Sequence, residues 1–178
     1  MPQDFTEKKI QSKLVYQGRL LRVEEDVVLL PDGNESRREY VRHPGASMII
    51  PLFDDDTVLL ERQYRYPVGK HLIEFPAGKL DSEESPLEAA QRELLEETGY
   101  VADSWTELGS FLLAVGYSDE RIYCFLARGL TYHKPNLDQG EFLETIRVPK
   151  QELFDWIDNG TLEDSKTIIG ASWLKSKI

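Results

Sequence analysis

The sequence has a single cysteine, three histidines and fewer basic than acidic residues. Because Cys124 stands alone, a disulfide framework and a cysteine-rich zinc cluster are both excluded. The 178 residues include 21 Lys and Arg against 32 Asp and Glu, which gives a formal net charge of −11. Such an acidic protein repels nucleic-acid backbones and anionic membranes, so we expect no partner of either kind. A small phosphate-bearing substrate stays compatible with this charge when divalent cations mask the carboxylates.

Long apolar runs are also missing. No stretch reaches the roughly 18 apolar residues that a membrane-spanning helix requires. The start of the sequence, Met-Pro-Gln-Asp-Phe-Thr-Glu, has neither the basic nor the apolar region of a signal peptide. We therefore expect a reduced, cytoplasmic globular protein. Its 40% apolar residues are enough for a sizeable core, and its length favours one domain with at most a small appendage.

The N-terminal quarter of the sequence predicts a β subdomain. Residues 11–31 carry an apolar run that ends at a Pro-Asp-Gly-Asn turn, and residues 36–42 would form the partner strand of a hairpin. A hairpin of this size is too small to hold a core alone, so it must pack on the rest of the chain or on a second copy. We expect a boundary that separates this subdomain, 1–45, from the main domain, 46–178.

The main domain is predicted to be α/β, with a mixed sheet and about three helices. Strands are expected at 46–53, 57–65, 72–76, 107–113, 121–127 and 144–148, and helices at 85–98, 150–158 and 165–175.

The helix over 85–98 has the clearest local signals. Ser85 suits the N-cap with Glu88 at capping-box spacing, and Gly99 suits the C-terminal stop. The core face of this helix is expected to be formed by Leu87, Ala90 and Leu94, which fall at helical spacing.

The same helix carries an acidic cluster in its C-terminal half. Glu93 and Glu97 are four residues apart and share one face, with Glu96 on its flank. These carboxylates repel one another, and the helix dipole disfavours anions at this end. A solvated acidic face is the ordinary interpretation of a Glu-rich helix. Hard divalent cations such as Mg²⁺ or Mn²⁺, however, prefer such carboxylate ligands.

The surrounding stretch resembles the Nudix box, G-x5-E-x7-R-E-U-x-E-E-x-G-U, in which U is aliphatic. The matching residues are Gly78, Glu84, Arg92, Glu93, Leu94, Glu96, Glu97 and Gly99. Tyr100 stands where the last aliphatic residue is usual. Within this pattern, Arg92 is placed to reach back to Glu84 and to tie the preceding loop to the helix.

Further segments are similar to the ADP-ribose pyrophosphatase branch of the Nudix family. They are Gln63–Pro67, Ile73–Gly78 and Gly140–Glu144, together with the Arg37-Arg38-Glu39 run in the N-terminal hairpin. One departure concerns the segment 114–120, where Val115 stands at a position that is usually proline in this branch.

The resemblance implies a Nudix α/β/α sandwich with an N-terminal antiparallel β subdomain, which pairs two subunits in a homodimer. It implies metal-dependent hydrolysis of ADP-ribose or a related nucleoside diphosphate sugar, with AMP and ribose 5-phosphate as products from ADP-ribose. Hydrolysis of another nucleoside diphosphate derivative, such as GDP-mannose, NADH or FAD, is an alternative. A nucleotide-binding module without turnover is a third interpretation, but such proteins typically lose box carboxylates that this chain keeps.

The resemblance also assigns roles to residues. Glu93, Glu96 and Glu97, with the backbone carbonyl of Ala77, would hold the divalent cations, Mg²⁺ or alternatively Mn²⁺. Glu93 and Glu97 thereby act in catalysis, and Glu141 is the preferred base for the attacking water. Glu144 is the rival for that role, although it is expected to begin a strand.

Three arginines are candidates for substrate binding. Arg65 would contact phosphate or the terminal ribose, and Arg37 and Arg38 could reach the nucleotide from the partner subunit. An exposed arginine without a ligand is the plain alternative for each of them.

Overall fold

The computed structural model describes residues 2–137, 140 and 142–177. Its chain divides into two compact units. The first, here called the N-terminal unit, contains the chain up to Pro44 together with Leu112–Arg121. The second, the main unit, contains Gly45–Phe111 and the chain from Ile122 onward.

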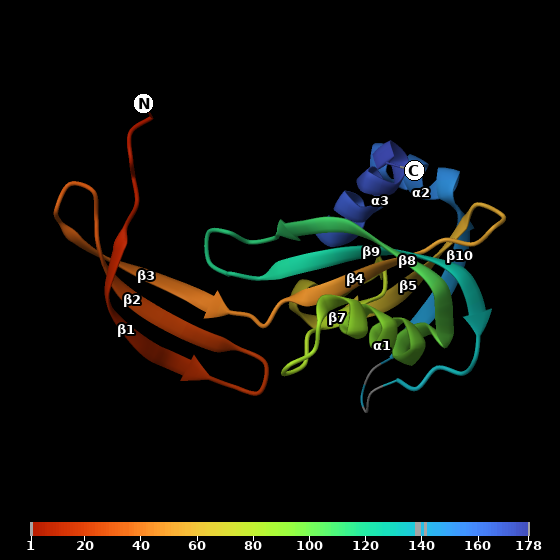
Figure 1. Ribbon diagram of the computed structural model, residues 1–178, viewed down its shortest axis with the longest axis horizontal. Helices are drawn as coiled ribbons and strands as arrows, with labels where there is room; N and C mark the ends of the chain where they lie inside the picture. The colour runs from red at the N-terminus through yellow and green to blue at the C-terminus, as the bar shows by residue number, and fades with distance from the viewer. Residues whose placement is uncertain (1, 138–139, 141, 178) are drawn as a thin grey trace. The chain divides into compact units, whose positions relative to one another are not determined.

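The N-terminal unit is built on a three-stranded antiparallel sheet, β1 (Lys8–Gln17), β2 (Arg22–Leu29) and β3 (Glu35–Arg42), in that order (Figure 1). The prediction of a two-stranded hairpin was therefore wrong in the number of strands. A tight turn, in which the N–H of Gly18 donates to the carbonyl of Leu21 at 2.8 Å, divides the run over 11–31. Leu20 and Leu21 lie at this turn. Because both side chains are apolar, the sequence pattern does not indicate a turn here.

The loop before β9 belongs to the N-terminal unit because it pairs with the edge of β3. The N–H of Val41 donates to the carbonyl of Tyr117 at 2.8 Å, and the N–H of Asp119 donates back to Val41 at 3.3 Å. Asp119 also accepts from Arg42 at 2.7 Å. The segment 114–120, which carries the Val115 departure, is thus fixed alongside the N-terminal sheet.

The main unit contains two sheets. One has the order β7 (Ala77–Lys79), β4 (Ala46–Pro51), β9 (Arg121–Tyr132) and β8 (Tyr100–Leu112), with β4 parallel to β9. The other has the antiparallel order β10 (Leu143–Pro149), β5 (Thr57–Arg65) and β6 (Lys70–Glu74), and the 3-10 turn η1 (Tyr66–Val68) joins β5 to β6.

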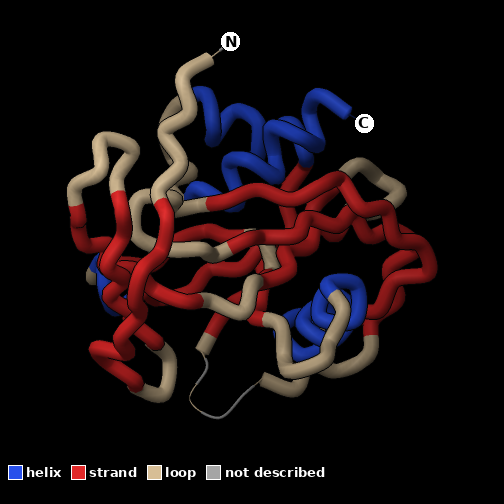
Figure 2. The backbone as a smooth tube through the Cα atoms, turned by 60° about the vertical axis from the view of Figure 1, so that its left-hand side comes forward, coloured by secondary structure: helices blue, strands red, loops and turns tan. Residues whose placement is uncertain are grey.

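Three helices flank these sheets in the described part of the chain: α1 (Pro86–Thr98), α2 (Lys150–Asp158) and α3 (Ser165–Lys177). Figures 1 and 2 show α1 on one side of the strands of the main unit and α2 and α3 on the other. The predicted mixed α/β architecture is confirmed. No helix among the described residues is long and apolar enough to cross a membrane.

Strand β4 lies at the centre of the core, and all its residues are buried. This matches its sequence, Ala-Ser-Met-Ile-Ile-Pro, since a strand covered on both faces does not alternate between apolar and polar residues. Cys124, next to it on β9, is fully buried as well. Burial raises the pKa of its thiol to about 12, so this cysteine behaves as a small apolar side chain.

One part of the predicted helix core is wrong. Ala90 and Leu94 of α1 are fully buried, but Leu87 is 37% exposed and Ala89 is buried in its place. Leu87 lies in the first turn of the helix, where it lines a cavity of about 420 Å³ together with Trp105 and other residues of β8 and β9.

Candidate active site

Helix α1 is fixed at both ends, as its sequence predicts. The hydroxyl of Ser85 accepts from the N–H of Glu88 at 3.3 Å, and the Glu88 carboxylate accepts from the N–H of Ser85 at 2.8 Å. This capping box satisfies two otherwise unpaired donors at the helix start. At the other end, Gly99 adopts a left-handed conformation with φ 75°, and its N–H donates to Leu95 at 2.9 Å. The acidic residues of α1 are therefore carried on a rigid element.

Glu97 lies on the buried side of this helix. It is only 7% exposed, and its Oε2 accepts a hydrogen bond from the backbone N–H of Ala77 at 3.0 Å. This bond joins the C-terminal half of α1 to the first residue of β7. Two of the predicted metal-binding groups, the Glu97 carboxylate and the Ala77 backbone, are thus brought together from different parts of the chain.

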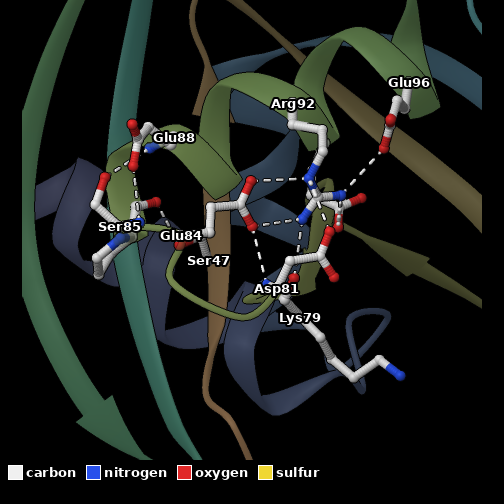
Figure 3. Close-up of polar contacts among 10 residues, drawn as sticks. Ser47, Lys79, Asp81, Glu84, Ser85, Glu88, Arg92 and Glu96 are labelled. Carbon is white, nitrogen blue, oxygen red and sulfur yellow. Dashed lines mark hydrogen bonds and ion pairs between the residues drawn. The ribbon is translucent and has the colours of Figure 1, made fainter.

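Arg92 connects the other acidic residues of the box. Its guanidinium donates to both carboxylate oxygens of Glu84, each at 2.9 Å, which confirms the predicted tie between loop and helix (Figure 3). It also donates to Glu93 at 2.7 Å, to Glu96 at 3.1 Å and to the carbonyl of Lys79 at 3.0 Å. The hydrogen bonds with Glu84 raise the pKa of Arg92, and those from Arg92 lower the pKa of Glu84.

Gly78 leaves the space that the Glu93 carboxylate fills. A Cβ at position 78 would lie 1.8 Å from Oε1 and 1.9 Å from Cδ of Glu93, which no rearrangement of a few tenths of an ångström relieves. Glu93 therefore packs directly against the backbone of β7, beside Ala77. The glycine of the box is explained by this close approach of a carboxylate to the strand.

The donor set on α1 and β7 has the chemistry of a hard-cation site. Glu93, Glu96 and Glu97 carry carboxylate oxygens of the kind that hard cations prefer, Glu97 accepts from the Ala77 N–H, and Gly78 leaves the space in which Glu93 lies. Within residues 2–137, 140 and 142–177, no group of three His, Cys, Asp or Glu side chains is gathered as a ready-made metal site. The carboxylates of Glu93 and Glu96 both pair with Arg92.

Arg65 lies at the end of β5 and is held by Glu74. Its Nε donates to Glu74 Oε1 at 2.7 Å, and its Nη2 donates to Oε2 at 2.8 Å, so the two side chains form a two-pronged pair. The Arg65 side chain is still 43% exposed. The pKa of Arg65 is raised, mainly by its hydrogen bonds with Glu74 and in part by the charge of Glu97. Arg65 is therefore within the electrostatic influence of an acidic residue of α1.

The other predicted substrate residues, Arg37 and Arg38, lie on β3 of the N-terminal unit. Arg37 pairs with Glu25 at 2.7 Å, and Arg38 pairs with Glu7. Both arginines are exposed in the single chain.

Glu141 and Glu144 are the two candidates for the base. Glu141 lies outside the described residues. Glu144 is the second residue of β10, as expected, and it lies 3.8 Å from Arg62 on the neighbouring strand β5.

Glu74 and Lys166, for which no role is predicted from the sequence, contact each other in the structure. Glu74 is buried, and Lys166 on α3 donates to its carboxylate. A signal for Glu74 was present, since it is a lone acid in the apolar run Leu72-Ile73-Glu74-Phe75-Pro76. The sequence contains no such signal for Lys166, because lysines are common on the exposed faces of C-terminal helices.

Comparisons with known proteins agree with this geometry. The model of the NUDIX domain family matches residues 41–169, and the model described as the nucleoside diphosphate sugar hydrolase N-terminal domain matches residues 7–41. The first match covers well over half of the chain and includes the whole box.

Individual relatives extend over nearly the full length. The chain is 38% identical to a methanol dehydrogenase activator of Bacillus methanolicus and 34% identical to an ADP-ribose pyrophosphatase of Bacillus subtilis (strain 168), each time over 96% of this chain and 94% of the relative. A crystal structure of an ADP compounds hydrolase superposes with a TM-score of 0.88 at 25% identity, covering 98% of this chain and 96% of the other. The chain therefore belongs to the Nudix family and is a Nudix hydrolase.

Proposed function

We propose that the protein hydrolyses the diphosphate bond of ADP-ribose, or of a closely related nucleoside diphosphate sugar. Water adds to one phosphorus and the bridging oxygen leaves with the other phosphate, so ADP-ribose and water give AMP and ribose 5-phosphate. The observation that carries this proposal is the contact of α1 with β7, where Glu97 accepts from the Ala77 N–H and Glu93 lies against Gly78, on a helix fixed at both ends. The similarity to a named ADP-ribose pyrophosphatase supports the choice of substrate.

Nudix hydrolases generally need a divalent cation, and we propose Mg²⁺, with Mn²⁺ as the alternative. Glu93, Glu96, Glu97 and the Ala77 carbonyl would hold it. When bound, the cation would neutralise the diphosphate and activate a water for in-line attack. Glu93 and Glu96 also accept from Arg92, whose hydrogen bonds with Glu84 keep the guanidinium close to the helix.

Two further residues complete the proposed machinery. Glu141 would orient or deprotonate the attacking water, since a glutamate between β9 and β10 can approach a bound substrate. Arg65 would bind a substrate phosphate with the guanidinium N–H groups that Glu74 leaves unused.

We propose a homodimer in which the N-terminal sheet covers a second copy. The support is its exposed apolar surface: Ile10, Leu14 and Tyr16 on β1 are each about half exposed in the single chain. In such a dimer, Arg37 or Arg38 would approach the nucleotide bound by the partner. Size-exclusion chromatography with light scattering tests the dimer, and a monomer at micromolar concentration would contradict it.

We further propose that the protein works in the cytoplasm. Its only cysteine, Cys124, is buried as a free thiol, which suits a reducing compartment. Cell fractionation of the source organism measures this directly.

Other nucleoside diphosphate derivatives, including GDP-mannose, NADH and FAD, are alternative substrates for the same site. The segment 114–120 is the place to look for such a difference, because Val115 departs from the usual proline there and is largely exposed.

A second candidate function is activation of a methanol dehydrogenase. It is favoured by the 38% identity to a protein with that name over 96% of this chain. The measurement is the initial rate of a methanol dehydrogenase with and without this protein, with Glu97→Gln in parallel. An unchanged rate at equimolar protein would remove this candidate.

The proposed hydrolysis is tested with a substrate panel. ADP-ribose, ADP-glucose, GDP-mannose, NADH, FAD and diadenosine polyphosphates are incubated with Mg²⁺ or EDTA, and released phosphomonoesters are measured with a coupled phosphatase. We expect ADP-ribose to give the highest kcat/KM. A preference for another member of the panel would keep the reaction and change the substrate.

A further inference from the structure

Glu74 is shared between two cations that come from different parts of the main unit. Arg65 from β5 takes both carboxylate oxygens, and Lys166 from the first turn of α3 also donates to Oε2. The two cations differ in exposure: Lys166 is 9% exposed, whereas the Arg65 side chain is 43% exposed. Glu74 thus connects a buried lysine to an arginine that is open to a ligand.

Lys166 also contacts a second carboxylate, that of Asp164. Its Nζ donates to Asp164 Oδ2 at 3.0 Å, and the same oxygen accepts from the N–H of Thr167 at 3.0 Å. The Thr167 hydroxyl lies 2.7 Å from Asp164 and accepts from the backbone N–H of Phe75 at 2.9 Å. The first turn of α3 therefore contacts two consecutive residues, Glu74 through its side chain and Phe75 through its backbone.

The segment that follows Glu74 is fixed residue by residue. The carbonyl of Pro76 accepts from the N–H of Ile49 at 2.9 Å, and the N–H of Ala77 donates to Glu97 at 3.0 Å. Helix α3 also packs closely here, because a Cβ at Gly170 would lie 3.3 Å from the ring of Phe75. One rigid segment thus links α3 to Arg65 at one end and to the acidic residues of α1 at the other.

A buried charge cluster of this kind is not by itself evidence of a stabilising role. Taking Lys166 and Glu74 out of water costs several kcal/mol per ion, and apolar replacements of buried ion pairs are often as stable or more stable. Glu61, which is also buried, lies opposite Glu74 in the strand ladder. A buried lysine at this point neutralises Glu74 without occupying the open side of Arg65.

We propose that Lys166 is a positioning residue for substrate binding: through Glu74 it holds the Arg65 guanidinium in the orientation that receives a substrate phosphate. This rests on the proposed role of Arg65 in the hydrolysis. Without Lys166, Glu74 keeps Arg65 as its one cationic partner among the described residues, and the Arg65–Glu74 pair gains alternative geometries. Lys166 touches no substrate, and its effect is exerted through Arg65.

A double-mutant cycle tests the proposal on the panel compound that the wild type hydrolyses best. We expect Lys166→Met to lower kcat/KM about tenfold, chiefly through a higher KM, and Arg65→Gln to lower it about a hundredfold. In the Arg65→Gln background, Lys166→Met should then have an effect of less than about twofold. Lys175→Met, an exposed lysine of the same helix, is the matched control and should equal the wild type. Effects that multiply in the double variant would overturn the proposal, because a general structural defect acts regardless of Arg65.

A second readout does not depend on activity. NMR hydrogen exchange of the Arg65 Nε–H, which donates to Glu74, should be about tenfold faster in Lys166→Met and unchanged in Lys175→Met. An unchanged exchange rate in Lys166→Met would overturn the proposal even if no panel compound is hydrolysed. If Lys166→Met does not fold, Lys166→Gln replaces it with the same two expectations. Failure of the proposed function would appear separately, as a wild type without turnover.

Discussion

The Oε2 atom of Glu97 accepts a hydrogen bond from the backbone N–H of Ala77 at 3.0 Å, across 20 positions of sequence. Glu97 lies near the C-terminal end of α1, where the helix dipole disfavours an anion. The N–H group of β7 compensates in part, and it aligns the carboxylate with the backbone that would supply a further oxygen ligand. The hydrogen bond thus joins β7 to a carboxylate at the negative end of the helix dipole, in a last turn that carries no basic residue.

Glu97→Gln should abolish most of the turnover while the fold remains. The amide oxygen of glutamine can still accept from the Ala77 N–H, but the charge that we propose to hold a divalent cation is gone. We expect kcat to fall by roughly a hundredfold or more at saturating Mg²⁺. The free energy of unfolding should change by less than about 1 kcal/mol, since one of several repelling carboxylates is removed. Glu152→Gln, an exposed glutamate in the first turn of α2, is the control. A near-normal rate for Glu97→Gln would remove the metal assignment.

Gly78→Ala should displace Glu93 without removing any charge. The added Cβ would lie 1.8 Å from the Glu93 carboxylate, so the side chain must leave its place beside Ala77. We expect kcat to fall at least about tenfold and the Mg²⁺ concentration for half-maximal rate to rise. Steady-state rates over a Mg²⁺ titration measure both. Wild-type values for the two would show that Glu93 acts from another position.

Arg92→Lys should be a damaging change although the charge is kept. A lysine ammonium cannot bond both oxygens of Glu84 and also reach Glu93, Glu96 and the Lys79 carbonyl. We expect kcat/KM to fall about 10- to 100-fold, equivalent to about 1.4–2.7 kcal/mol. Arg62→Lys, at a half-exposed arginine with one distant acidic partner, is the control. Equal rates in the two variants would argue against the connecting role of Arg92.

Glu74 should contribute to the pH dependence of stability. Burial acts to raise its pKa, but the hydrogen bonds from Arg65 and the charge of Lys166 outweigh burial and lower it to about 2, from an ordinary value of 4.5. The folded-state pKa is the lower one, so the contribution is complete above about pH 4.5 and is lost as the pH falls towards 2. Urea unfolding of the wild type and Glu74→Gln should give a difference that shrinks over this range. A difference independent of pH would contradict the assignment.

Glu141→Gln and Glu144→Gln form a matched pair for the base. Glu144 lies in β10 opposite Arg62, so its substitution should leave kcat within about twofold of the wild type. Glu141→Gln should lower kcat more than it raises KM, because a base acts at the chemical step. An unchanged kcat in Glu141→Gln, or a large loss in Glu144→Gln, would move the role away from Glu141.

Local signals predicted much of the main unit. The bounds of β5 and α2 agree with the sequence analysis, as do the capping box at Ser85 and the left-handed Gly99, because turn and cap residues act over a few positions. β8 was predicted to begin near residue 107 but begins at Tyr100, directly after Gly99. Its first residues alternate weakly between apolar and polar types, and pairing with β9 rather than local pattern makes them a strand.

The acidic part of the site and its tie to Glu84 were predictable, whereas two contacts made by long-range packing were not. Fixed spacing on one helix places Glu93, Glu96 and Glu97 on neighbouring positions. The contacts of Glu97 with Ala77 and of Lys166 with Glu74 join residues 20 and 92 positions apart, and they depend on how β7 and α3 pack. No local pattern in the sequence contains that information.

The most direct test of the central claim is to follow ADP-ribose with Mg²⁺, with EDTA, and with Glu97→Gln, and to identify the products by chromatography. We predict equal amounts of AMP and ribose 5-phosphate from the wild type with Mg²⁺. We predict no measurable product with EDTA, and at most about one hundredth of the wild-type rate from Glu97→Gln. Hydrolysis that continues in EDTA, or a Glu97→Gln variant as fast as the wild type, would contradict catalysis by a cation held on α1.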